Sequence, residues 1–82
     1  MLEVVARPAE LAGLPWAVEC ARTEPQLFRS GKNAEACARR LANRLAESGA
    51  GVRLTIFLRD GSVARALEVL PPSSAAEVAY PS

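Results

Sequence analysis

The chain has 82 residues and half of them are apolar, which allows one domain with a single modest hydrophobic core. Ten basic and nine acidic residues give a formal net charge of +1, a balance that argues against strong non-specific nucleic-acid binding. The sequence contains no histidine, which excludes a histidine base, a Ser-His or Cys-His nucleophile, and an ordinary structural zinc site at its two cysteines.

The first half of the chain predicts three short strands, over residues 2–7, 16–22 and 27–29. Pro8 is expected to end the first strand, and residues 8–15 are expected to form a loop with a helical turn at residues 9–12. Residues 23–26 contain a proline and predict a turn. Alternation in the second strand places Trp16, Val18 and Cys20 on one face and Ala17, Glu19 and Ala21 on the other.

Residues 30–49 form the one strongly periodic segment and predict a helix. Ser30 is a suitable N-cap, and Gly49 can take the left-handed conformation just past the helix end. The apolar stripe has helical spacing and consists mostly of small residues: Ala34, Cys37, Ala38, Leu41, Ala42, Leu45 and Ala46. Because small residues allow close approach, we expect this stripe to lie against a sheet.

The second half predicts a hairpin. Alternating strands are expected over residues 52–59 and 62–70, joined by a two-residue turn at Asp60-Gly61. This turn places Leu58 opposite Val63, Ile56 opposite Arg65 and Leu54 opposite Leu67. Arg65 interrupts the apolar face, so it either lies at a sheet edge or follows a bulge that shifts the register.

The sequence therefore predicts an α+β domain over residues 1–70. We expect a single antiparallel sheet of about five strands, with one helix inserted after the third strand and packed on one face. Strands that follow one another in the sequence are expected to run antiparallel, except for the two strands that the helix connects. Residues 71–82 are rich in Pro, Ser and Ala and are expected to form a flexible tail, the alternative being a short turn with a capping box at Ser74 and Glu77.

Three short motifs carry a resemblance: Trp16-Ala17-Val18 on a strand, the Ser30-capped helix with Ala34, Ala38, Leu41 and Ala42, and Asp60-Gly61 in a hairpin. Over residues 2–69 the chain resembles the bacterial domain of unknown function 2188. Pro15 and Asn33 depart from the family pattern, which has Gly before the Trp and Glu in the capping box. The resemblance implies a fold and a bacterial source and supplies no catalytic residue.

No constellation of residues predicts catalysis, and no cofactor or metal site is expected. Cys20 and Cys37 are interpreted as small hydrophobic residues of the core, with an oxidising pair as the alternative. Ser30-Gly31-Lys32 resembles half of a phosphate loop, but the remaining positions do not match, so a plain capped helix start is expected, with anion binding as the alternative. The chain shows no signal peptide and no apolar run of membrane-span length, so we expect a cytoplasmic protein with reduced thiols.

Two surfaces are candidate binding sites. The far face of the sheet is expected to be open, flat and sparsely charged, and to carry Ala17, Ala21, Thr55, Phe57, Ala64 and Ala66. The arginines of a weak nucleic-acid surface would be Arg39, Arg40 and Arg44 on the helix and Arg53 and Arg59 beside Phe57 on the sheet. We therefore predict a non-enzymatic protein-interaction module that self-associates, as a dimer, through the sheet, face to face or edge to edge. The partner could also be another protein, and the alternative function is weak nucleic-acid binding.

Overall fold

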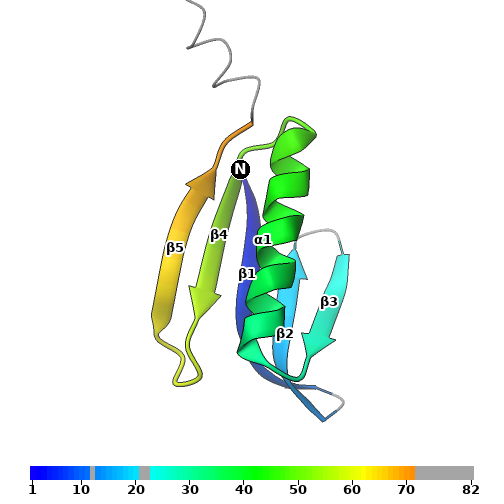
Figure 1. Ribbon diagram of the computed structural model, residues 1–82, viewed down its shortest axis with the longest axis vertical. Helices are drawn as coiled ribbons and strands as arrows, with labels where there is room; N and C mark the ends of the chain where they lie inside the picture. The colour runs from blue at the N-terminus through cyan, green and yellow to red at the C-terminus, as the bar shows by residue number, and fades with distance from the viewer. Residues whose placement is uncertain (12, 21–22, 72–82) are drawn as a thin grey trace, which may run out of the picture.

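The computed structural model describes residues 1–11, 13–20 and 23–71, and the tail with its predicted capping box lies outside these residues. Five strands and one helix form two layers, with the helix lying across one face of the sheet (Figure 1). The elements are β1 (Leu2–Leu11), β2 (Leu14–Cys20), β3 (Thr23–Phe28), α1 (Gly31–Glu47), β4 (Val52–Phe57) and β5 (Val63–Val69). The predicted α+β class and the single helix on a five-stranded sheet are confirmed.

The sheet is mixed, so the prediction of a purely antiparallel sheet is wrong. The strand order is β3-β2-β1-β4-β5; β1 and β4 run parallel, whereas the other neighbours are antiparallel. The helix carries the chain from β3 at one edge back across the sheet, and β4 then runs beside β1 in the same direction (Figure 1). The central parallel pair is therefore a consequence of the helical crossover.

Pro8 does not end the first strand. β1 continues to Leu11, so the predicted loop and helical turn over residues 9–12 are also wrong for residues 9–11, while Ala12 lies outside the described residues. β4 pairs with β1 only over residues 2–6, and at Pro8 the strand is paired with Trp16 of β2. Proline is tolerated in a strand where its missing N–H has no ladder bond to make, and among the described strands none pairs with Pro8 on the β4 side of β1.

β3 is also longer than predicted. It includes Pro25 and replaces the turn that was expected over residues 23–26. β3 is an edge strand, the usual place for proline within a sheet, and its register with β2 shifts between Val18 and Cys20.

The helix forms as predicted. The Ser30 hydroxyl accepts a hydrogen bond of 3.2 Å from the Asn33 N–H, and Gly49 has a φ of 105° just past the C-terminus. Four alanines spaced four residues apart, Ala34, Ala38, Ala42 and Ala46, are at most 2 % exposed. Ala34, Ala38 and Ala42 pack into one cluster with strand residues such as Val4 and Leu54, so the small side chains let the helix lie close to the sheet.

Gly31 has a packing role that the sequence did not indicate. A Cβ atom at this position would lie 2.9 Å from Cζ2 of Trp16, closer than normal contact allows. Trp16 is 7 % exposed and belongs to the core cluster. The first helical residue is therefore a glycine in contact with the indole ring, and no phosphate site is needed to explain it.

The β4–β5 hairpin has a three-residue loop, so the predicted two-residue turn is wrong. The Gly61 N–H donates to the Leu58 carbonyl over 2.9 Å, and the Leu58 N–H donates to the Ser62 carbonyl over 2.7 Å. Gly61 has a φ of 90°, the left-handed position that closes such a loop. Leu58 is 50 % exposed and does not extend the buried face of β4.

A bulge restores the predicted register beyond this loop. Phe57 lies opposite Val63, Ile56 lies opposite Arg65, and Ala64 is the extra residue between the two pairs. Both explanations offered for Arg65 therefore apply: β5 is an edge strand, and a bulge precedes the residue.

Candidate interaction surface

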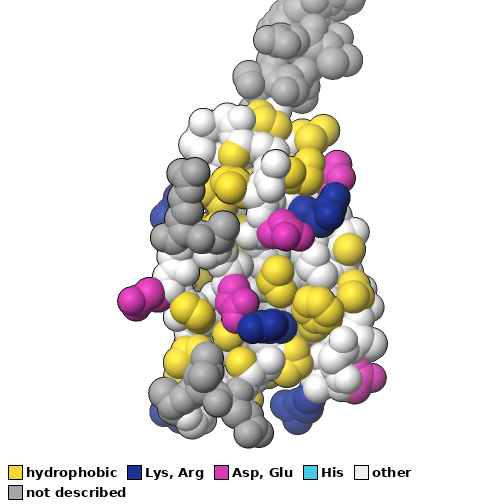
Figure 2. Space-filling view, turned by 180° about the vertical axis from the view of Figure 1, so that it is seen from behind, with side chains coloured by type: hydrophobic (Ala, Val, Ile, Leu, Met, Phe, Trp, Pro, Cys, Tyr) yellow, Lys and Arg dark blue, Asp and Glu magenta, His cyan; other side chains and the backbone are white. Residues whose placement is uncertain are grey.

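The face of the sheet turned away from α1 is the candidate site, and we call it the open face. Strand alternation and register place on it Glu3, Val5, Arg7, Ala17, Glu19, Leu27, Arg53, Thr55, Phe57, Val63, Ala66 and Glu68. Within the described residues no second layer covers this face, and Figure 2 shows apolar side chains there with acidic and basic groups among them. The predicted open surface is therefore present, although it is more charged than expected.

The predicted interaction residues are only partly brought together. Thr55 and Phe57 are half-buried on β4, and Ala66 is exposed opposite Thr55 on β5. Ala64 is exposed at the bulge. Ala17 is 0 % exposed and offers no contact surface, and Ala21 lies outside the described residues.

Ion pairs account for much of the charge on the open face. Nε and Nη2 of Arg7 donate to Oε2 of Glu19 over 3.1 and 2.7 Å, which joins β1 to β2. Nη2 of Arg53 lies 4.0 Å from Oε1 of Glu68 on β5. These side chains are exposed enough to be screened by water, so each pair stabilises the fold by no more than about 1 kcal/mol.

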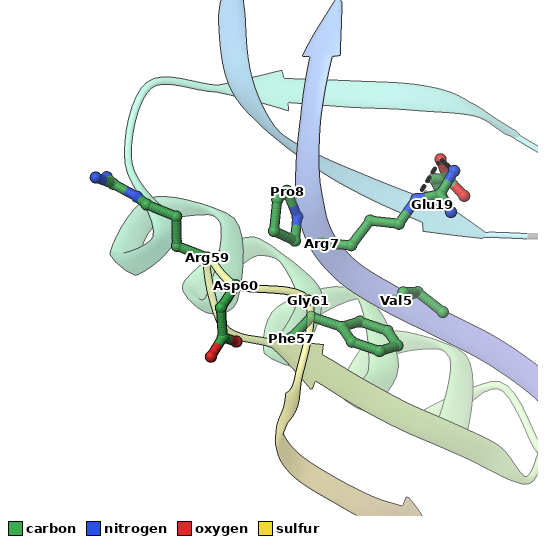
Figure 3. Close-up of a pocket in the computed structure, with 8 residues that line it drawn as sticks. All are labelled: Val5, Arg7, Pro8, Glu19, Phe57, Arg59, Asp60 and Gly61. Carbon is green, nitrogen blue, oxygen red and sulfur yellow. Dashed lines mark hydrogen bonds and ion pairs between the residues drawn. The ribbon is translucent and has the colours of Figure 1, made fainter.

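A shallow hollow of about 530 Å³ lies on the open face next to the hairpin (Figure 3). The Phe57 ring lies over the gap between β4 and β1 on the side of Val5, whereas Arg7 extends away from it to Glu19 (Figure 3). The side chains of Arg59 and Asp60 point away from the ring (Figure 3). The hollow therefore presents an apolar floor with its charged groups directed outward.

Asp60 is the ionisable group beside this hollow whose pKa is shifted. The hydroxyl and the N–H of Ser62 both donate to the Asp60 carboxylate, over 2.6 and 2.9 Å, and these bonds lower the pKa of Asp60 below its usual value. Such a group stays charged and stabilises the loop. No cluster of three metal-ligating side chains occurs in the part of the chain that the structure describes.

The predicted nucleic-acid residues do not form one surface. Arg39, Arg40 and Arg44 lie on α1, on the other side of the molecule from the open face. Arg39 is bound to Glu35 over 3.0 Å, and Arg53 is near Glu68. Arg59 lies in the hairpin loop.

Both cysteines are free and half-buried, and both pack against the core cluster. The Cys37 thiol donates to Oε1 of Gln26 over 3.3 Å. Packing against the core agrees with their interpretation as small hydrophobic residues, although neither is fully buried.

The sequence predicted Ala64 and Ala66 of β5 as interaction residues but not the large apolar side chains at the two ends of this strand. Among the described residues four large hydrophobic side chains are exposed: Met1 at 67 %, Leu58 at 50 %, Val63 at 55 % and Leu70 at 61 %. Three of the four lie in the hairpin, in β5 or directly after it. The sequence shows apolar residues at both ends of the last strand. Their exposure could not be predicted from it, because that exposure depends on the position of this strand at an edge of the sheet.

No helix among the described residues is long and apolar enough to cross a membrane. Comparison of the chain with family models, curated proteins and solved structures gives no match. The resemblance to the bacterial domain of unknown function 2188 therefore stays a prediction.

Proposed function

We propose that this protein is a non-enzymatic interaction module that associates with a second copy of itself through its sheet. The observation that carries the proposal is the exposure of Leu58 and Val63 at the hairpin, where Val63 lies opposite Phe57 on the open face, together with exposed Leu70 just past the other end of β5. Exposed apolar surface that is contiguous and has polar groups at its margin is typical of protein-binding sites.

The thin core supports the same proposal. The largest fully buried side chains are Leu54, Val4 and Val52, and the helix contributes four alanines to the interface. Small domains with little buried apolar surface gain stability from association, because binding of a second copy shifts the folding equilibrium by mass action. A dimer would also cover Val63, which is 55 % exposed in the single chain.

The alternative, weak nucleic-acid binding, has less support, because the candidate arginines lie on two layers and two of them are near carboxylates. A salt titration against single-stranded and duplex nucleic acid separates the two proposals. Phosphate contacts make affinity fall steeply with salt, whereas association through apolar surface does not. The cytoplasmic location and the bacterial source also stay predictions.

Val63→Lys tests the proposal, with Ala36→Lys on the exposed side of α1 as the matched control. Val63 is exposed, so the monomer should fold, but the ammonium group would enter the proposed contact. By light scattering across a range of concentrations, we expect the unchanged protein and Ala36→Lys to reach the mass of a dimer, and Val63→Lys to remain smaller. Equal masses for the two variants would refute the placement of the contact.

A further inference from the structure

The outer edge of β5 is the strongest remaining feature of the molecule. We propose that β5 pairs antiparallel with β5 of a second copy, so that two five-stranded sheets join into one continuous sheet. This inference rests on the proposed self-association and names the elements that meet.

The two edges of the sheet differ in their ability to accept another strand. β3 includes Pro25, which has no N–H to donate, and its pairing with β2 is irregular. β5 contains no proline, and its residues 65–69 pair in regular register with β4. Among the described strands β5 is bonded only to β4, so its outer backbone groups can pair with another strand.

The side chains of β5 complement those of an identical strand running in the opposite direction. Val63 begins the strand and Leu70 follows its end, and both are more than half exposed. An antiparallel arrangement brings the Val63 end of each strand beside the Leu70 end of the other. Arg65 lies on the helix side of β5 and Glu68 on the open face. An antiparallel arrangement can hold the like charges of the two copies apart, whereas an in-register parallel arrangement would put them side by side.

Symmetry restricts the register. A twofold axis perpendicular to the sheet keeps the two faces distinct, so each residue meets one from the same face. The axis then passes midway between one residue and the same residue of the second copy. A register centred on Arg65 or Glu68 would oppose like charges. One centred on Leu67 joins the two half-buried Leu67 side chains on the helix side and places Ala66 opposite the second copy's Glu68.

Opposite charges substituted at Ala66 test this register. Ala66 is exposed, so neither Ala66→Lys nor Ala66→Glu disturbs the core. In the proposed register the new group faces the second copy's Glu68 twice per dimer. We expect Ala66→Lys to lower the dimer dissociation constant about 2- to 30-fold and Ala66→Glu to raise it by a similar factor, with the difference shrinking at high salt. Ala36→Lys and Ala36→Glu serve as controls that add the same charges to α1.

Phe57→Arg separates edge pairing from face-to-face packing. Phe57 is on β4, one strand in from the edge, so an edge-paired dimer should keep its mass in this variant. A dimer that dissociates in Phe57→Arg and does not distinguish Ala66→Lys from Ala66→Glu would overturn edge pairing but leave self-association standing. A monomer at every concentration would overturn both proposals, and would mean that Arg65 and the bulge at Ala64 protect this edge.

Discussion

The alanine stripe of α1 allows a quantitative prediction of how much stability is lost when a larger side chain is placed between helix and sheet. Ala38 lies near the middle of the stripe and is 0 % exposed, in the same cluster as Val4 and Leu54. Ala38→Val adds two carbon atoms where the packed layers leave no room for them. Overpacking of this kind costs about 1–3 kcal/mol, and the branched side chain costs the helix about 0.5 kcal/mol more.

The loss is large relative to the stability of a domain of this size. We expect Ala38→Val to lower the free energy of unfolding by about 1.5–3.5 kcal/mol, from a total of about 4–12 kcal/mol, and the Tm by about 6–28 °C. Ala36→Val at the exposed position two residues earlier is the control, for which we expect a loss of only about 0.5 kcal/mol. Urea unfolding followed by fluorescence of the single tryptophan, Trp16, measures both variants. Equal stabilities would refute close packing of the helix on the sheet.

Two further predictions concern the helix start and the hairpin. Gly31→Ala should lower the free energy of unfolding by about 1 kcal/mol, because the clash with Trp16 exceeds the gain in helix propensity, and a more stable variant in urea unfolding would contradict this contact. The pKa of Asp60 is lowered from 3.8 by its hydrogen bonds from Ser62, so the ionised carboxylate stabilises the native loop above pH 3.8, and this contribution disappears as the pH falls through the lower folded value. When the pH is lowered from about 6 to about 3, Asp60→Asn should therefore lose less stability than the unchanged protein. The urea concentration at the midpoint of unfolding measures this loss, and an equal decrease for the two proteins would contradict the role of this carboxylate.

Local signals in the sequence were sufficient for the helix. Ser30 and Gly49 mark its ends through hydrogen bonding and backbone conformation, and the spacing of the alanines identifies its buried side. These properties depend on neighbours within a few residues. The alternation of β4 was readable for the same reason, since Val52, Leu54 and Ile56 are all at most 5 % exposed.

The prolines were misread because their effect depends on the sheet and not on the sequence around them. Pro8 and Pro25 both lie within strands, where local rules placed a strand end and a turn. Among the described strands, the β1–β4 pairing ends before Pro8, and β3, which contains Pro25, lies at an edge, so each proline has one side without a strand partner. The parallel pairing of β1 and β4 is likewise a long-range property of the crossover.

The candidate site was predictable in outline. One helix covers one face of a sheet, so an open face around Phe57 followed from counting elements. The burial of Ala17 and the pairing of Arg7 with Glu19 did not follow, because both depend on which strands are neighbours. The exposure of the β5 edge depends on the same strand order, and the proposed β5–β5 pairing rests on this edge.

Sedimentation equilibrium of the unchanged protein is the most direct test of the central claim, which is self-association through the sheet. The account predicts a reversible rise from the monomer mass of 8.7 kDa to twice that value with increasing concentration, and a smaller rise for Val63→Lys. A monomer mass at every concentration, in a sample whose Trp16 fluorescence reports a folded core, would contradict it.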